Sequence, residues 1–292
     1  MAKSNKVMIQ VCLCGAGTKK AQAPTVPYTA EELAEQVIAV AKAGASVVHI
    51  HVREDKEVNG VMEIGYKSMG LKPFTDAVEA CREACKAAGV DVIINLTTSG
   101  GEYEDYKRLQ HLSALKPEMC SYDPGSLNWG NSYIFKNEPS LLEHLGTLCQ
   151  ELNCKPECEI FDGGFCTNIA YYLKKGILTN PVHCQLVLGV AGGMPGTVES
   201  VSYLTRHLPE GCTWSITGIG HAHMACMLAG LAADCDGLRV GLEDNIYMEK
   251  GVLATNVQLV ERAIRLGKEA GREIATPEDT RQILGLKGKM GD

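Results

Sequence analysis

The sequence predicts an α/β protein, a (β/α)8 TIM barrel formed as a single domain by residues 1–292. Three observations lead to this fold class. Short apolar runs typical of strands alternate with longer amphipathic stretches along the chain, and eight such pairs are found. The length of 292 residues suits one barrel, a fold that often reaches about 250 residues or more in one domain. No linker or low-complexity tract divides the chain, so one domain is the simplest organisation.

Each expected strand is followed by an expected helix. The strands are expected at residues 7–12, 46–52, 90–96, 119–121, 157–161, 183–188, 213–217 and 237–240. The helices are expected at residues 30–43, 74–88, 103–114, 141–152, 165–175, 198–206, 224–233 and 255–270. A polar tail is expected at residues 285–292. This alternation indicates parallel strands joined by helical crossovers.

Local signals support these elements. In the first helix, Thr29 is an N-cap with Glu32 three residues further on, which predicts a capping box, and Gly44 predicts the end of the helix. Residues 92–94 are continuously apolar, as in a strand buried on both faces. An open doubly wound sheet is the alternative fold, but residues 14–20 lack the third glycine of a dinucleotide-binding signature.

The composition excludes several classes of protein. The 28 Lys and Arg residues are outnumbered by 35 Asp and Glu, which argues against non-specific nucleic-acid binding. An apolar fraction of 45% argues against global disorder. No apolar run reaches the roughly 18 residues of a membrane-spanning helix, and the N-terminal run has no signal-peptide cleavage site. We therefore expect a cytoplasmic protein with no nucleic-acid or membrane partner.

The thirteen cysteines are odd in number and cannot all pair within one chain. They include no Cys-x-x-Cys motif, which argues against a zinc ribbon or a thioredoxin-like site. Cys81 and Cys85 are four residues apart in an expected helix, so a metal-binding pair is one interpretation. We favour the other, in which the cysteines are reduced and buried as small hydrophobic residues.

Two strand ends carry groups that can bind a metal ion. The second strand ends in His49 and His51, and residues two apart in a strand point to the same side, so both imidazoles can reach one ion. The eighth strand ends in a charged run, 239–245, from which Glu243 can supply a third ligand. Two histidines, one glutamate and an open fourth position form a known catalytic zinc pattern. Packed core histidines and a surface salt-bridge cluster are the alternatives.

Loops rich in glycine indicate anion binding. Residues 95–101 combine hydroxyl groups with flexible backbone that can hold a carboxylate or phosphate. The loops 189–194 and 218–223 each precede a helix whose N-terminus favours an anion. The second of them contains His221 and His223, either a second metal pair or, as we expect, one ligand contact and one structural residue.

Together these motifs resemble those of the β-keto acid cleavage enzymes, over nearly the whole chain. The resemblance is carried by residues 49–53, 95–101, 155–162 and 239–245, with further similarity at 251–256 and 271–277. The His-x-His and Arg-x-Gly-Leu-Glu-Asp-Asn motifs are specific in combination. The sequence departs from the family where residues 220–223 replace the usual Arg and Gln of the seventh-strand loop, and where an extended segment, 56–69, follows the second strand.

The resemblance implies a TIM-barrel enzyme that binds one divalent metal ion, normally Zn²⁺, and forms a homotetramer. It implies the conversion of a β-keto acid and acetyl-CoA into acetoacetate and a new acyl-CoA, as in lysine fermentation. The implied metal ligands are His49, His51 and Glu243, and the implied catalytic pair is Asp244 and Arg239. Substrate contacts are expected at Thr98, Ser99, Gly100, Ser121 and Glu157.

The chemistry of these residues agrees with that reaction. A divalent ion would polarise the β-keto acid and stabilise the enolate formed when Asp244 removes a proton. Arg239 would orient Asp244 and lower its pKa. Attack on the acetyl thioester, CoA transfer and retro-Claisen cleavage would follow. A metal-dependent aldolase or hydrolase without CoA and a non-catalytic barrel remain the alternatives, and acyl specificity depends on positions such as Glu159, Tyr122 and Asn128.

Overall fold

The computed structural model describes residues 4–286, so residues 287–292 of the expected polar tail lie outside the described residues. Eight parallel strands form a closed barrel in which the last pairs with the first. In order around the barrel they are β1 (Lys6–Cys12), β2 (Val47–Ile50), β5 (Ile93–Leu96), β6 (Met119–Tyr122), β9 (Lys155–Ile160), β10 (His183–Leu188), β11 (Thr213–Gly218) and β12 (Gly237–Val240). The predicted fold class is confirmed.

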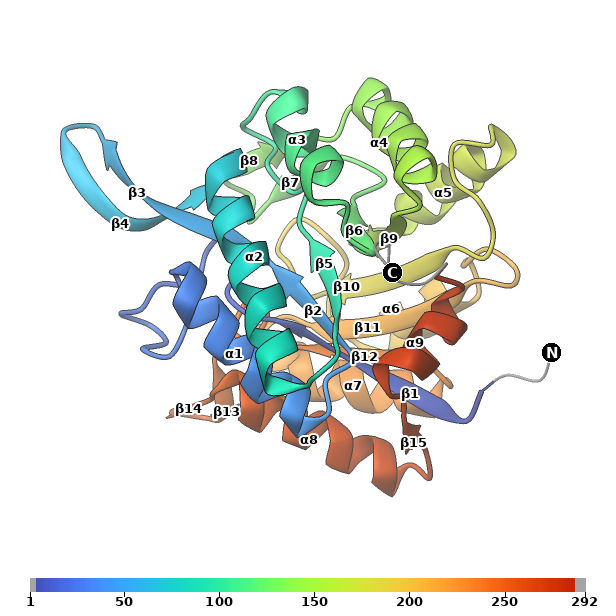
Figure 1. Cartoon of the computed structure of the whole chain (residues 1–292). Coiled ribbons are helices and arrows are strands. Elements are labelled where there is room, and N and C mark those ends of the chain that lie inside the picture. The colour runs from blue at the N-terminus through green and yellow to red at the C-terminus, as the bar shows by residue number, and fades with distance from the viewer. Residues whose placement is uncertain (1–3, 287–292) are drawn as a thin grey trace.

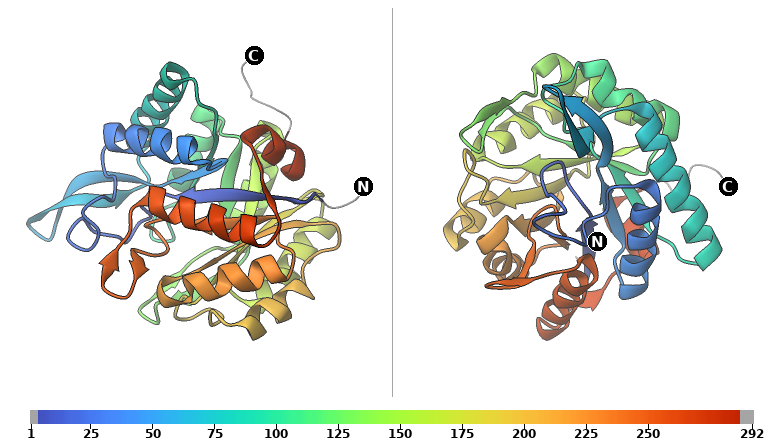
Figure 2. Two further views of the ribbon diagram at one scale, coloured as in Figure 1. Left: turned by 90° about the horizontal axis from the view of Figure 1, so that it is seen from below. Right: turned by 90° about the vertical axis from the view of Figure 1, so that its left-hand side faces the viewer.

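Helices cover the outside of the barrel (Figure 1; Figure 2, right). They are α1 (Ala30–Ala43), α2 (Leu71–Ala88), α3 (Asp105–Leu115), α4 (Pro139–Leu152), α5 (Gly163–Lys174), α6 (Val198–Thr205), α7 (His223–Ala232), α8 (Asn256–Glu269) and α9 (Pro277–Leu284), with a 3-10 turn η1 (Gly220–Ala222) before α7. The eight expected helices are present with small differences at their ends. In α1, Thr29 and Glu32 form the predicted capping box, and Gly44 ends the helix with a φ of 110°.

Three β-hairpins extend the loops: β3 (Val52–Val58) with β4 (Val61–Ser68), β7 (Leu127–Trp129) with β8 (Tyr133–Phe135), and β13 (Tyr247–Glu249) with β14 (Val252–Leu253). The strand expected at 46–52 is wrong at its end, because β2 stops at Ile50 and Val52 pairs within the first hairpin. That hairpin turns at Asn59 and Gly60, whose φ angles of 51° and 79° suit a tight turn. It projects from the barrel at the left of Figure 1.

The N-terminal end of the barrel is closed by elements that the sequence pattern did not predict. The strand β15 (Glu273–Ile274) pairs with β1, and α9 follows it. Leu284 of α9 packs in an apolar cluster with residues near the starts of four strands: Met8, Val47, Ile93 and Met119. Lys6 and Asp279 form an ion pair of 2.6 Å, and Arg281 pairs with two further carboxylates. The opposite end of the barrel is therefore the end available for a site.

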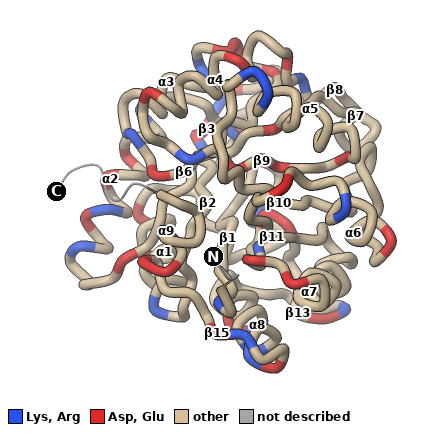
Figure 3. The backbone as a smooth tube through the Cα atoms, turned by 90° about the vertical axis from the view of Figure 1, so that its right-hand side faces the viewer, with Lys and Arg blue, Asp and Glu red and all other residues tan. Residues whose placement is uncertain are grey.

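The structure confirms the expected burial of the cysteines. None of the thirteen cysteines, all of which lie in the described part of the chain, forms a disulfide, and twelve of them are buried. Cys81 and Cys85 belong to the buried face of α2. Acidic and basic residues are interspersed along the chain (Figure 3). Within residues 4–286, no helix has both the length and the apolar character needed to cross a membrane.

Candidate active site

A cavity of about 780 Å³ opens at the C-terminal ends of the barrel strands. Five titratable side chains in its lining lie at or just after the ends of three barrel strands: His51, Glu159, Arg239, Glu243 and Asp244. The β3–β4 hairpin and the loop after β5 also line it. Catalytic groups of barrel enzymes lie at this end of the fold, so the cavity is the candidate active site.

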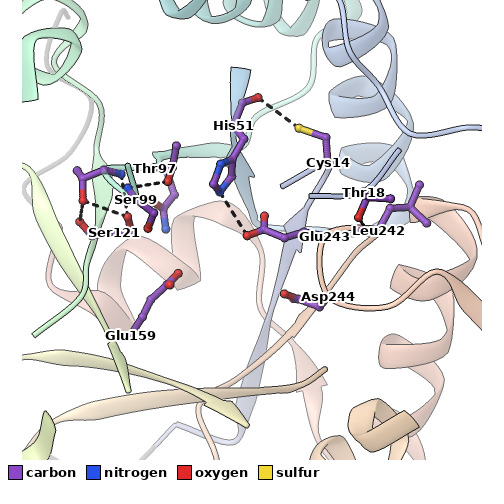
Figure 4. A network of polar contacts seen from close by, with 12 residues as sticks. Cys14, Thr18, His51, Thr97, Ser99, Ser121, Glu159, Leu242, Glu243 and Asp244 are labelled. Carbon is purple, nitrogen blue, oxygen red and sulfur yellow. Dashed lines mark hydrogen bonds and ion pairs between the residues drawn. The ribbon is translucent and has the colours of Figure 1, made fainter. Parts of the chain in front are cut away.

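The three predicted metal ligands lie together. The rings of His49 and His51 have centroids 5.1 Å apart, and Glu243 Oε1 lies 3.3 Å from His51 Nε2 (Figure 4). One ligand atom from each residue lies within 4.8 Å of the other two. Among the described residues, the buried atoms His49 Nδ1 and Glu243 Oε2 have no hydrogen-bond partner. A buried polar atom left unpaired costs about 1–3 kcal/mol, and a divalent cation would remove that cost, so this donor set fits Zn²⁺.

The protonation states of these residues also suit metal binding. Burial lowers the pKa of His49 to about 4, so its imidazole is neutral at pH 7. Burial alone would raise the pKa of Glu243, but the adjacent His51 and Arg239 outweigh it and hold the pKa well below its usual range. A neutral imidazole and an ionised carboxylate are the forms that coordinate a metal ion.

Two glycines allow the loop after β12 to bring Glu243 to the histidines. Gly241 has a φ of 136°, and a Cβ atom there would lie 2.1 Å from the carbonyl oxygen of Cys12. At Gly15, a Cβ atom would lie 2.5 Å from Glu243 Cγ. The side chain of Asn256 then accepts a hydrogen bond of 2.9 Å from Leu242 N. The position of the carboxylate is therefore fixed by backbone packing.

We expect Gly241→Ala to lower the free energy of unfolding by about 1–3 kcal/mol and to weaken zinc binding, because the new Cβ cannot fit against the first strand. Gly251→Ala is the matched control, since Gly251 has a φ of 80° but open space around it. Thermal unfolding and zinc content check both variants. Equal losses in the two variants would show that the close approach to Cys12 has no special importance.

The predicted catalytic pair forms a bidentate ion pair. Arg239 Nε and Nη2 donate to the two carboxylate oxygens of Asp244, each at 3.0 Å, and Thr217 Oγ1 donates to Asp244 Oδ2 at 3.2 Å. Arg239 also donates to Glu159 at 2.5 Å and to Glu243 at 3.2 Å. One buried guanidinium thus orients three carboxylates, and Glu159 and Asp244 flank the same space (Figure 4).

The expected net lowering of the Asp244 pKa is wrong in direction. Burial of the carboxyl group raises its pKa above the usual value, and Arg239 only reduces that rise. The neighbouring Glu243 and Glu159 add to the rise because like charges disfavour ionisation. Asp244 is therefore a stronger base than an exposed aspartate.

Of the five expected substrate contacts, two line the cavity and three are buried beneath its lining. Ser99 and Gly100 line the cavity. Thr98 and Ser121 lie behind them: Ser121 Oγ accepts a hydrogen bond of 2.9 Å from Thr98 N, and both residues are almost fully buried. Glu157 lies inside the barrel, where it accepts hydrogen bonds from Gln10 and Asn95, and it is absent from the cavity lining.

Glu159 is the acidic residue of β9 that reaches the cavity. The sequence alone indicates Glu159 only as one of several positions on which specificity for the acyl group depends. Glu157 and Glu159 are two apart in a strand, so alternation predicts that both point inward, as they do. Glu159 is the nearer of the two to the C-terminal end of β9, where catalytic groups of barrel enzymes lie, and this position is the signal that could have selected it over Glu157.

We expect Glu157→Gln to flatten the pH dependence of stability between about pH 4.5 and 8. Burial raises the pKa of Glu157 to about 8 from 4.5, so folding takes up a proton in this range. The stability contributed by the protonated carboxyl is therefore full below about pH 4.5 and is lost as the pH rises toward 8. Melting temperatures at pH 5, 6.5 and 8 measure the effect, and Glu83→Gln, at an exposed site on α2, is the control. An unchanged slope in Glu157→Gln would contradict the assignment.

Other candidate residues do not join the metal group. His221 is exposed in η1, whereas His223 is buried at the start of α7, and neither belongs to a three-ligand group within the described residues. Arg53 donates to the backbone carbonyls of Gly65, Cys14 and Thr18, so it holds the first hairpin against the loop after β1. Of the other specificity positions, Tyr122 and Asn128 do not line the cavity.

The chain is similar to known proteins over nearly its whole length. Residues 6–286 match the beta-keto acid cleavage enzyme family. The chain is 41% identical to the 3-keto-5-aminohexanoate cleavage enzyme of Fusobacterium nucleatum, covering 97% of this chain and 98% of that protein. It is 32% identical to the 3-dehydrocarnitine:acetyl-CoA trimethylamine transferase of Rhizobium meliloti, covering 98% of each. The apo structure of ObcA is similar in fold, with a TM-score of 0.75 at 22% identity over 90% of this chain and 66% of that chain.

The barrel and the group of charged residues at its mouth define the class of protein as a barrel enzyme with its site at the C-terminal ends of the strands. Within that class, the chain belongs to the β-keto acid cleavage enzyme family. The resemblance inferred from the motifs is confirmed.

Proposed function

We propose that this chain catalyses the reaction of a β-keto acid with acetyl-CoA to give acetoacetate and a new acyl-CoA. The observation that carries the proposal is that His49, His51 and Glu243 meet beside the Arg239–Asp244 pair in one cavity. Family membership supports a β-keto acid as the substrate class. The name of the Rhizobium meliloti relative supports acetyl-CoA as the co-substrate.

In this proposal His49, His51 and Glu243 hold one Zn²⁺ ion. When bound, the ion supplies Lewis-acid polarisation of the ketone and carboxylate oxygens of the β-keto acid. Ser99 and Gly100, which line the same cavity, contact the substrate. Thr98 and Ser121, which are buried beneath the cavity lining, hydrogen-bond to each other and so hold the loop after β5 in place.

Asp244 is the general base of the proposed reaction. It removes a proton from the carbon between the ketone and the carboxylate of the substrate. Arg239 holds both of its oxygens, and Thr217 holds one, so the carboxylate has a fixed direction. A pKa raised by burial increases its strength as a base, which favours proton abstraction from carbon.

The remaining steps conserve all atoms. The deprotonated carbon attacks the thioester carbonyl of acetyl-CoA, forming a carbon–carbon bond and releasing the CoA thiolate. The thiolate adds to the original ketone carbon, and the bond from that carbon to the attacking carbon breaks. The products are the new acyl-CoA and, after Asp244 returns its proton, acetoacetate.

We propose an amino-substituted β-keto acid as the substrate, 3-keto-5-aminohexanoate being the first candidate and lysine fermentation the first process to consider. The name of the Fusobacterium nucleatum relative supports this choice. Besides the proposed metal ligand Glu243, three glutamates line the cavity, Glu63, Glu102 and Glu159. Glu102 pairs with Lys67 and Glu159 with Arg239, and carboxylates of this kind can also pair with an ammonium group.

A homotetramer is also proposed. The β3–β4 hairpin exposes three large apolar side chains, Val61, Met62 and Ile64, which are 58% to 67% accessible to solvent in the single chain. Contiguous exposed apolar groups are typical of surfaces that bind another protein. Light scattering of the purified protein measures the subunit number, and a monomer would contradict this part of the proposal.

The experiment that tests the function is a panel of β-keto acids incubated with acetyl-CoA and the zinc-loaded protein. Mass spectrometry should detect a new acyl-CoA together with acetoacetate, and the amino-substituted acid should give the highest kcat/KM. Acetoacetate formed without any acyl-CoA, or cleavage that does not require acetyl-CoA, would instead assign the site to a metal-dependent hydrolase or aldolase.

A further inference from the structure

A second group of metal-ligating side chains lies outside the cavity. The Sγ atoms of Cys120, Cys149 and Cys154 all lie within 4.8 Å of one another, and those of Cys120 and Cys149 are 3.4 Å apart. Each of these residues is at most 4% exposed. We call them the three-cysteine cluster. The proposed function uses none of its members, and the oxygen and nitrogen ligands of the active site are separate from it.

The fold brings these cysteines together from three segments. Cys120 lies in β6, and Cys149 lies in the last turn of α4. The helix ends at Asn153, whose φ of 52° turns the chain back, and Cys154 N then donates a hydrogen bond of 2.9 Å to Cys149 O. The cluster therefore joins the barrel wall to α4 and to the loop before β9.

We propose that the three-cysteine cluster binds a soft divalent cation through three thiolates and an open fourth position. Sulfur atoms around an ion with metal–sulfur bonds of about 2.3 Å are about 3.8–4.0 Å apart. The Cys120–Cys149 separation of 3.4 Å is slightly shorter, and all three sulfur atoms lie within 4.8 Å of one another, so a small adjustment would suit an ion. Thiolates select soft or borderline ions, of which Zn²⁺ is the common example.

The charge of the site favours a divalent ion. Three thiolates with a divalent ion carry a net charge of −1, whereas a monovalent ion would leave −2, and burial makes the larger charge more costly. Cys149 is also at the C-terminal end of α4, where the helix dipole favours a cation.

An ion can reach the cluster from outside. A second cavity, of about 280 Å³, is lined by Cys149 and Cys154 together with Gln150, Asn153 and Lys155. Two of the three cysteines are thus in contact with this cavity, and a water molecule there can fill the fourth position. Since the cluster lies between a strand and a helix of the barrel wall, its ion would stabilise the fold and take no part in the reaction.

The test is a titration of the reduced, full-length protein with Cd²⁺, with bound ions counted by native mass spectrometry. A thiolate-to-Cd²⁺ absorption band in the ultraviolet should saturate at one ion per chain. The variants Cys149→Ser and Cys154→Ser should each lose the band while keeping acyl-CoA formation within about twofold of the unaltered protein. The control Cys81→Ser, at a buried cysteine of α2, should keep the band.

Absence of the band in the unaltered protein would overturn the proposal, as would its persistence in both cluster variants. Should the serine variants fail to fold, zinc X-ray absorption of the unaltered, zinc-loaded protein decides the question. A shell of sulfur neighbours at about 2.3 Å supports the site, and a spectrum with only nitrogen and oxygen neighbours contradicts it. The absorption band and the X-ray absorption spectrum do not depend on which substrate the active site accepts.

Discussion

Asp244→Asn is expected to lower kcat by a factor of about 10²–10⁴ and to leave the zinc content unchanged. The amide has the same shape as the carboxylate but cannot take a proton from carbon. It still accepts one hydrogen bond from Arg239, so the loop after β12 should keep its conformation. Zinc should be retained because Asp244 is not among the residues that form the three-ligand group.

Steady-state kinetics and metal analysis of the same preparation check this expectation. The control is Asp76→Asn, which removes an exposed carboxylate paired with Lys72 on α2. Normal turnover in Asp244→Asn would remove the general base from the proposed mechanism. Loss of zinc together with activity would instead assign Asp244 to the metal site.

His49→Ala is expected to lose both zinc and measurable acyl-CoA formation, while its circular dichroism spectrum remains that of a folded barrel. His49 is 1% exposed, and its Nδ1 atom is one of the buried atoms with no partner among the described residues. Its removal leaves two ligands, too few for the three that catalytic zinc sites supply from the protein. Developing negative charge would then lose a stabilisation worth several kcal/mol.

Zinc content after dialysis, measured per folded chain, is the primary readout for this variant. His144→Ala, at an exposed histidine of α4, is the matched control and should retain zinc and activity. A full equivalent of tightly bound zinc in His49→Ala would show that the ion lies elsewhere. The three-cysteine cluster must be considered in interpreting the zinc content, so the variant is best compared in a Cys149→Ser background.

Local patterns predicted the barrel and much of the site. The eight strand–helix pairs follow from the spacing of apolar residues along the chain. The closeness of His49 and His51 follows from the alternation of side chains in a strand. The approach of Glu243 to them requires the closed barrel, since β12 pairs with β1 and β1 with β2. No local pattern gives that pairing. The charged run after the eighth strand made Glu243 a candidate third ligand, and the resemblance of the motifs to a known family then implied the same three residues.

Other features of the structure could not be predicted from the spacing of apolar residues. The β3–β4 hairpin is largely exposed, so it lacks the alternating apolar residues that predict a half-buried strand. Its turn, Asn59-Gly60, is nevertheless a sequence signal for a hairpin. Helix α9 begins with Thr276 and Pro277, which are capping signals, yet its apolar face is small. The net rise in the Asp244 pKa depends on burial, and no sequence pattern measures burial against a neighbouring charge.

The ion pair between Lys6 and Asp279 has a practical consequence for handling the protein. It ties the first strand to the last helix on the side of the barrel remote from the cavity, where both ends of the described chain are drawn (Figure 1). A surface tether attached near residue 4 or residue 286 would therefore start on the side of the barrel opposite the cavity and leave the cavity open to acetyl-CoA. Immobilised catalyst and free catalyst should accordingly turn over at similar rates.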